Sequence, residues 1–457
     1  MDGEERKVRF GVVGLLGPDI EELIRSAPTE VAEATEGMHA ADLAEIAEDL
    51  EPADRALLLN HLPVERVAEL IGYLELSRVQ ETLGSLEPGR AALVLRSMSP
   101  DERADAVAHL ERDTAEAFLA RLSRSDREET RRLLAYPRNS AGGLMTTDFV
   151  ALSPDAPAGE ALDRVRQAAS DAETIYTLYA VDENGRLVGV LSLRDLLAAP
   201  VAAPVREVMR DDFVSARVET DQEEVANLIS KYDLLALPVV DTANRMLGIV
   251  TVDDVLDVMV EESTEDIQKI GGVAPLAGGY FQTSFWRVAR NRAGWLGVLF
   301  VGSMFTTSIL EYFEGTLENA LYLVFFLPLI MATGGNSGSQ STTLIIRGLS
   351  LGDVDEGDSG RVFLREMASG LIMGSLLGAV GLARASLGHQ PWPVSLLIGG
   401  SIVAVVTAGT VIGGLLPFAI RRLGLDPAVA SAPMVSSLLD VVTLVLYFGA
   451  ARIALSV

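Results

Sequence analysis

The second half of the chain is dominated by long apolar runs, whereas the first half alternates short apolar and polar stretches. Five runs approach or exceed the roughly 20 residues that cross a bilayer as a helix. They lie at Ala293–Leu310, Ala320–Ile346, Met367–Gly388, Val394–Ile420 and Ala428–Ala451. We therefore predict an all-α transmembrane domain of five helices over residues 284–457.

Between residues 31 and 135 the apolar positions follow a helical period in stretches of about 12 residues. Prolines separate these stretches, and proline suits the first position of a helix. They are Pro52, Pro63, Pro88 and Pro100. The pattern predicts an all-α superhelical domain, with residues 1–30 as an N-terminal tail.

Residues 136–258 contain one α/β unit twice. The stretch "AVDENGRLVGVLSLRDLL" resembles "VVDTANRMLGIVTVDDVL", which aligns Gly189 with Gly248 and Asp195 with Asp254. Each copy has two apolar strand runs that flank turn residues and a helix that follows them. The two copies resemble a tandem pair of cystathionine-β-synthase (CBS) domains.

Between residues 252 and 272 the chain is rich in acids and helical in pattern, and we assign residues 259–283 to a connecting helix and linker that follow the CBS pair. Helical spacing aligns Asp254, Asp257, Glu261 and Glu265. Like charges at this spacing destabilise a helix unless they are screened or bridged. The helix is therefore either a solvated linker or a place where cations bind.

Charge separates the two halves. From Ser284 onward ten basic residues balance ten acidic ones, so the first 283 residues carry the whole net charge of −27. So acidic a surface repels nucleic acid and favours cations. The chain has no cysteine and four histidines, which excludes thiolate metal sites and argues against a histidine-based metal enzyme.

The connectors between the apolar runs set the orientation. Arginines precede the first run, separate the second from the third and follow the fourth, whereas "EYFEGTLEN" and "GHQPWP" contain no Lys or Arg. The positive-inside rule then places the N-terminus in the cytoplasm and the C-terminus outside. The N-terminus also lacks the apolar core of a signal peptide.

The second apolar run contains the polar sequence "TGGNSGSQSTT". Its glycines disfavour a helix, so this segment either packs closely against other helices or faces water. The fifth run contains Asp440 with Ser436 and Thr443 nearby. A carboxylate inside a membrane is costly and usually functional. The alternative is a protonated Asp440 that is hydrogen-bonded to a neighbouring helix.

The CBS resemblance implies an adenine nucleotide site. In that family a Ser/Thr-x-x-Asp element contacts the ribose, and the matching positions here are Ser192–Asp195 and Thr251–Asp254. Arg194, Asp195 and Asp254 are therefore candidate contacts for ATP or another adenine nucleotide.

The order of the parts, with "YPRNSAGGLMTTDF", "KYDLLALPVVD", "EESTEDIQKIGG" and "PLIMATGGNSGSQ", resembles the MgtE magnesium transporter family. The resemblance covers nearly the whole chain beyond the first thirty or so residues. It implies a homodimeric Mg²⁺ channel in the cytoplasmic membrane, with its pore between two five-helix bundles in the lipid. It also implies cytosolic domains that bind Mg²⁺ and close the pore.

Position by position, the resemblance makes Asp440 the pore acid that holds a hydrated Mg²⁺. It assigns a broken second helix that lines the pore to Pro328, Gly334, Gly335 and Asn336. It pairs Asp101 with Asp105 in the helical domain, near Gly142. The remaining regulatory Mg²⁺ positions that it implies are Asp221, Glu223, Ser230, Asp233, Asp254, Asp257, Glu262, Glu265, Asp266 and, at the cytoplasmic pore mouth, Asp426.

Three alternatives stay open. The same architecture could transport Co²⁺ or Ca²⁺, because Asp440 alone does not fix selectivity. The chain could be a membrane enzyme regulated by its CBS pair, but we find no catalytic set and expect no enzyme. It could also be a non-conducting cation sensor, which leaves Asp440 unexplained.

Overall fold

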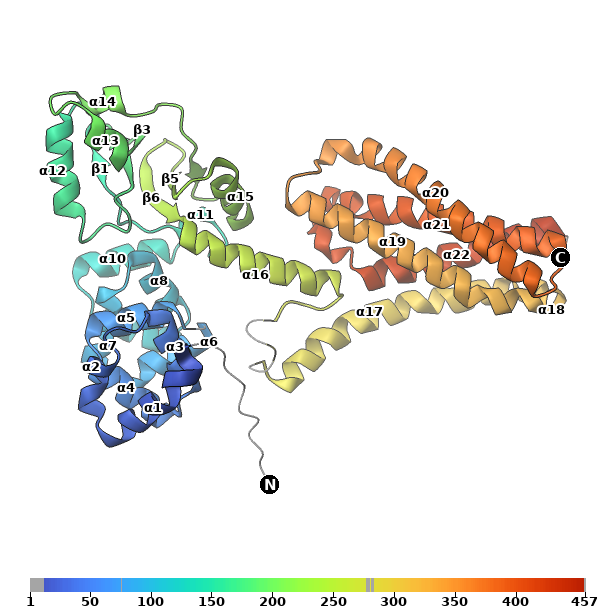
Figure 1. The fold of residues 1–457 in the computed structure, drawn as a ribbon, viewed down its shortest axis with the longest axis horizontal. Helices are drawn as coiled ribbons and strands as arrows, with labels where there is room; N and C mark the ends of the chain where they lie inside the picture. The colour runs from blue at the N-terminus through green and yellow to red at the C-terminus, as the bar shows by residue number, and fades with distance from the viewer. Residues whose placement is uncertain (1–11, 75, 277–279, 281–282, 456–457) are drawn as a thin grey trace. The chain divides into compact units, whose positions relative to one another are not determined.

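The computed structural model describes residues 12–74, 76–276, 280 and 283–455. The chain divides into two compact units, Met1–Val260 and Glu261–Val457 (Figure 1). Residues 1–11 of the predicted tail and part of the predicted linker lie outside the described residues.

The first unit begins with a stack of short helices. They are α1 (Val12–Ser26), α2 (Val31–Ala34), α3 (Ala40–Asp49), α4 (Pro52–His61), α5 (Val64–Gly72), α6 (Leu76–Ser85), α7 (Pro88–Ser97), α8 (Pro100–Ala108), α9 (Arg112–Leu119) and α10 (Arg124–Leu133). From α3 to α10 each helix starts 12 residues after the one before it. This repeat confirms the predicted helical superhelix.

The predicted tail is shorter than expected. Helix α1 lies inside residues 1–30, and its Ile20 and Ile24 are buried in the same core as Leu43 and Leu58. The apolar positions of α1 therefore belong to the helical domain.

The CBS pair follows as two three-stranded sheets, as predicted. Their strands are β1 (Ala151–Leu152), β2 (Thr177–Val181), β3 (Leu187–Ser192), β4 (Ala216–Arg217), β5 (Ala236–Val240) and β6 (Met246–Thr251). The orders are β1-β2-β3 and β4-β5-β6, each with one parallel and one antiparallel pairing. The helices around them are α11 (Ala141–Leu144), α12 (Ala158–Ala168), α13 (Leu193–Ala198), α14 (Val205–Val208) and α15 (Gln222–Tyr232).

The acidic helix α16 (Val252–Ile270) begins directly after β6, and the division between the two units falls within it. Its first turns pack into the second CBS domain through the buried Val255 and Val258. Its last residue, Ile270, packs against residues of the second unit.

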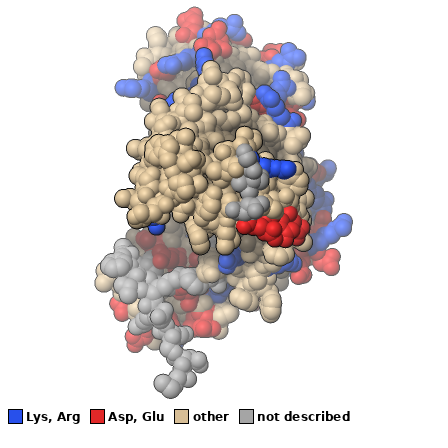
Figure 2. Space-filling model, turned by 90° about the vertical axis from the view of Figure 1, so that its right-hand side faces the viewer, with Lys and Arg blue, Asp and Glu red and all other residues tan. Residues whose placement is uncertain are grey.

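The second unit is helical. Its elements are α17 (Phe285–Tyr312), α18 (Glu314–Asn319), η2 (Leu321–Phe326), α19 (Leu327–Ser350), η3 (Glu356–Asp358), α20 (Ser359–Leu387), α21 (Trp392–Arg422), η4 (Pro427–Val429) and α22 (Ala432–Leu455). Among the described residues five helical segments are long and apolar enough to cross a membrane. Seen from the end near the C-terminus, this unit has a broad uncharged surface (Figure 2).

The second span changes from the 3-10 helix η2 to α19 directly before Pro328, but the break expected at Gly334, Gly335 and Asn336 is wrong, because α19 is continuous from Leu327 to Ser350. Pro328 lies in its first turn, where a missing N–H breaks no helical hydrogen bond. The glycines provide close contacts instead. A Cβ added to Gly335 would lie 2.6 Å from Ser436 Oγ of α22. Tertiary packing thus outweighs the low helix propensity of glycine.

Candidate cation sites

Asp440 lies on α22 beside the contact with α19. Its side chain is half-buried, and Thr443, one turn further on, is fully buried with a hydroxyl that has no hydrogen-bond partner. Thr443 Oγ1 is 2.9 Å from the position of a Cβ on Gly334. Within the described part of the chain no side chain donates a hydrogen bond to the Asp440 carboxylate. Among the described residues, therefore, Asp440 is not hydrogen-bonded to a side chain of a neighbouring helix.

The polar residues of α19 divide between two faces. Ser337, Ser341 and Thr342 are buried in the bundle, and Thr342 Oγ1 donates to Gly413 O at 2.8 Å. Asn336, in contrast, is exposed. The residues predicted for the pore therefore combine close glycine packing with a polar side chain that remains accessible.

The helical bundle contains a second acid, which is not among the residues predicted from the sequence. Glu366 lies in α20, where its carboxylate accepts a hydrogen bond from Ser341 Oγ of α19. Its backbone oxygen accepts from Thr410 Oγ1 of α21 at 2.9 Å. The predicted third span starts at Met367, one residue too late to include Glu366, although α20 already begins at Ser359.

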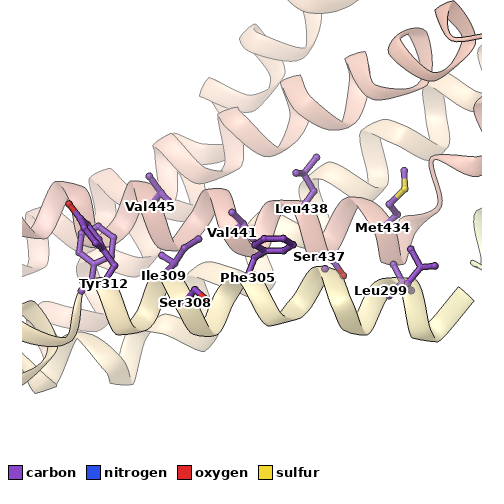
Figure 3. A pocket seen from close by; sticks show the side chains of 13 residues that line it. Leu299, Phe305, Ser308, Ile309, Tyr312, Met434, Ser437, Leu438, Val441 and Val445 are labelled. Atoms are coloured by element: carbon purple, nitrogen blue, oxygen red, sulfur yellow. The ribbon is translucent and has the colours of Figure 1, made fainter.

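An apolar groove of about 600 Å³ lies between α17 and α22 (Figure 3). Phe305, Ile309, Leu438 and Val441 line it, and its polar side chains are hydroxyls. None of the described residues that line this groove is a carboxylate.

In the first unit the structure brings together two predicted site residues from distant parts of the sequence, Asp101 of α8 and Asp254 of α16. Asp101 is 9% exposed, and its Oδ1 has no hydrogen-bond partner. Asp254 Oδ2 accepts a hydrogen bond from Thr251 Oγ1 at 2.7 Å. Burial and the negative charge of Asp101 raise the pKa of Asp254 to about 8. Burial likewise raises the pKa of Asp101.

Four further acids, which the sequence analysis missed, surround this pair. Together they form what we call the acidic group: Asp101, Glu102, Asp148, Glu173, Asp253 and Asp254. Burial, with the charge of Glu129, raises the pKa of Asp148 to about 6. Apart from the adjacent acids in α8 and in α16, these residues come from separate parts of the helical domain and the CBS pair, so no spacing along the chain links them.

Asp105 and Gly142, the other two residues predicted where the helical domain meets the CBS pair, have contacts different from those of the acidic group. Asp105 Oδ1 is 3.6 Å from Arg138 Nη2. The N–H of Gly142 donates to Val218 O at 3.0 Å, and a Cβ there would lie 2.8 Å from the Tyr136 ring. Gly142 therefore permits a close approach of the chain to Tyr136.

The acids predicted in the second CBS domain lie at opposite ends of α15. Asp221 caps its start by accepting a hydrogen bond from the N–H of Glu223 at 2.9 Å. Ser230 lies near the other end, and Asp233 ends the helix with a φ of 51°. An 11-residue helix is about 16 Å long. The four predicted residues therefore form two separate pairs, Asp221 with Glu223 and Ser230 with Asp233.

A further group lies at the end of α16. Lys269 Nζ is 2.5 Å from Asp426 Oδ2 and also pairs with Glu265. Asp266 Oδ2 accepts a hydrogen bond from Ser350 Oγ at 3.1 Å. Desolvation opposes the charge of Lys269, but its bonds to Asp426 and Glu265 outweigh that effect and raise its pKa. The acids here are among the predicted site residues, whereas Lys269 is not.

The two remaining predicted residues of α16 lie outside these groups. Asp257 is exposed and Glu262 is half-buried. Within the described residues no three Asp, Glu or His side chains converge in the geometry of a metal-ion cluster. A dication here would therefore retain several waters, which is usual for Mg²⁺.

Family models and known proteins match this chain over most of its length. The MgtE pattern, described as a divalent cation transporter, matches residues 327–450, and the MgtE intracellular N domain matches residues 38–139. CBS domains match residues 141–202 and 205–261. The magnesium transporter MgtE of Thermus thermophilus is 45% identical over 329 residues, which are 72% of this chain and 73% of that protein.

The chain belongs to the MgtE family of magnesium transporters. The MgtE protein of Enterococcus faecalis is 34% identical over 71% of both chains. Members of the family transport ions rather than catalyse reactions, as expected from the missing catalytic set.

Two solved structures resemble the first part of this chain. One is the soluble part of a magnesium transporter, with 32% identity and a TM-score of 0.52, which covers 55% of this chain and 98% of that one. The other is the cytosolic domain of the Mg²⁺ channel MgtE in complex with ATP. It has 40% identity and a TM-score of 0.52, and covers 53% of this chain and all of that one.

The predicted nucleotide residues differ between the two CBS copies. Asp195 lines a cavity of about 450 Å³ together with Glu207 and Arg210, while Arg194 is exposed. Asp254, its counterpart in the second copy, lies in the acidic group. Of the two predicted positions, the structure places Asp195 at a cavity and Asp254 among carboxylates.

Proposed function

We propose that this MgtE-family protein is a Mg²⁺-selective channel that imports magnesium and closes when cytosolic Mg²⁺ binds its acidic residues. The observation that carries the proposal is the unpaired carboxylate of Asp440, beside the glycine- and hydroxyl-rich contact of α19 with α22. Hard cations such as Mg²⁺ prefer oxygen ligands. Asp440 would attract the hydrated ion by its charge and by hydrogen bonds to the ion's water.

The proposed pore lies between two copies of the chain. Asn336 is exposed and Asp440 is half-buried in one chain, so both could face a passage completed by a second bundle. Arginines at the start of α17 and the end of α21 support a cytoplasmic N-terminus and an outer C-terminus.

Closure follows from the same electrostatics. The acids of the acidic group repel one another, and burial makes their charges costly. Mg²⁺ would neutralise and bridge them, and so draw the helical domain, the CBS pair and α16 together. An adenine nucleotide, for which Asp195 and the adjoining cavity are the candidate site, would add a second signal.

Magnesium uptake by starved cells that produce the full-length protein tests the proposal. Asp440→Ala should reduce uptake at least tenfold, while Asp353→Ala, an exposed acid beyond the end of α19, should leave it unchanged. Uptake that persists in Asp440→Ala would contradict the pore assignment. Competition by Co²⁺ or Ca²⁺ at equal concentration would show a less selective channel.

A further inference from the structure

A lysine among the acids at the end of α16 has no role in the function proposed above. The Lys269 ammonium lies between Glu265, one turn earlier in the same helix, and Asp426, which precedes α22. Asp266 is adjacent in the sequence and engages Ser350 of α19. Three carboxylates and one ammonium therefore share the place where α16 meets the ends of the membrane helices.

The Asp426 carboxylate, which contacts Lys269, is held in place by its own turn. Its Oδ1 accepts a hydrogen bond from the N–H of Ala428 at 2.8 Å, which holds the carboxylate against its own turn. Its Oδ2 remains for Lys269. Ile270, which follows Lys269 in the chain, packs against a buried cluster that includes Ile346 and Ala428. An ion pair and an apolar contact therefore attach the end of α16 side by side.

The ammonium occupies the position that a bridging cation would need. A dication that joins Glu265 to Asp426 must approach the same oxygens that Lys269 now contacts. Lys269 is 22% exposed and Asp426 is 39% exposed, so water and ions can reach the pair. A lysine amine is a compact charge on a flexible chain and can swing away.

We propose that Lys269 substitutes for Mg²⁺ as the cation at the contact between the end of α16 and the turn before α22. Its ammonium holds α16 to the turn before α22 when no Mg²⁺ is bound there, and Mg²⁺ displaces it in order to bridge Glu265 and Asp426. Some channels are then closed even without Mg²⁺. The difference in open fraction between zero and saturating Mg²⁺ is therefore smaller than it would be if only the acids were present. This inference rests on the proposed function, because it requires a Mg²⁺-gated pore.

Recordings from the full-length protein in liposome patches test the inference through the ratio of open to closed channels, without Mg²⁺ and at saturating cytosolic Mg²⁺. Lys269→Gln should raise the ratio without Mg²⁺ about two- to fivefold, the effect expected for a partly exposed ion pair. At saturating Mg²⁺ the ratio should equal that of the wild type. Lys269→Arg, which keeps the charge, should retain most of the closure.

Two further variants serve as controls. Arg361→Gln removes an exposed ion pair between Arg361 of α20 and Asp358 and should change neither ratio. Asp426→Asn removes the same ion pair, so combining it with Lys269→Gln should add little at zero Mg²⁺. If Lys269→Gln carries no current, Asp426→Asn alone decides whether losing the pair opens the channel without Mg²⁺.

The inference is overturned if Lys269→Gln leaves the ratio at zero Mg²⁺ unchanged, or raises it equally at zero and saturating Mg²⁺, since the latter indicates a general loosening. A wild-type channel whose current does not respond to Mg²⁺ would instead overturn the proposed function. The two failures are therefore distinguishable.

Discussion

The acidic group of the first unit and the bundle of α19, α20, α21 and α22 in the second unit differ in how they hold polar residues inside the protein. In the acidic group carboxylates lie near enough to raise one another's pKa, and neither Asp101 nor Asp254 has an ion pair among the described residues. In the bundle Glu366 is bonded to a neutral hydroxyl, and the helices meet through glycines. The first arrangement gathers charges of one sign, whereas the second is a closely packed frame.

This difference assigns separate tasks to the two regions. Repulsion among buried acids destabilises their association until a cation or a proton relieves it. Close glycine contacts and hydroxyl bonds do not depend on Mg²⁺. In the proposed function, sensing would therefore belong to the acidic group, and the bundle would provide a constant framework around Asp440.

Enlarging a glycine in the frame should disrupt it. A Cβ on Gly413 of α21 would collide with Gly338 O of α19, so Gly413→Val should abolish uptake and lower the yield of folded protein in detergent. Gly400→Val is the matched control, since a Cβ on this glycine of the same helix meets nothing within 4 Å. Normal uptake by Gly413→Val would show that the bundle is not tightly packed.

Replacing Asp254 in the acidic group should stabilise the cytosolic part at neutral pH without Mg²⁺. Asp254→Asn keeps an acceptor for Thr251 and needs no proton to avoid the cost of burial and the repulsion by Asp101. We expect a gain of about 1–2 kcal/mol, or about 2–8 °C in the midpoint of thermal unfolding for a domain of this size. The additional stabilisation by Mg²⁺ should shrink. Asp211→Asn, an exposed acid, is the control, and equal responses of both variants would refute the repulsion.

The acidic group should also make stability depend on pH. Asp254, with a pKa of about 8, keeps its proton in the folded state where the unfolded chain, with a pKa near 4, has lost it. Unfolding releases that proton, so without Mg²⁺ the stability contributed by this group falls as pH rises from about 4 to 8. Mg²⁺ must displace the proton, so its stabilisation should grow over the same range. Thermal unfolding at several pH values measures both trends, which Asp254→Asn should flatten.

The sequence predicts the features that depend on local periodicity. The 12-residue spacing from α3 to α10, the two CBS copies and the five apolar helices all follow from patterns within single segments. The break expected at Gly334 and Gly335 is wrong because their contacts with α21 and α22, which lie far away in sequence, stabilise the helix.

Site residues are less predictable than elements, because tertiary contacts create them. Asp101 and Asp254 were named through the family resemblance, but Asp148 and Glu173 join them only when the helical domain meets the first CBS domain. Lys269 similarly gains its position from Asp426, 157 residues away. Charge spacing along one helix contains no information on either arrangement.

The smallest expected effect concerns Glu366, the acid in the frame. Glu366→Gln retains an oxygen that can accept from Ser341 and should keep uptake within about twofold, whereas Glu366→Leu leaves that hydroxyl without an acceptor and should cost about 0.6–1.7 kcal/mol, the range for hydrogen bonds between membrane helices. Unfolding in detergent mixtures measures this loss. Adding Ser341→Ala to Glu366→Leu should cost little more, because the bond is already absent. If Glu366→Gln instead reduces uptake as strongly as Asp440→Ala, the charge of Glu366 acts on the ion itself, and the bundle then contains a second ion site rather than a neutral frame.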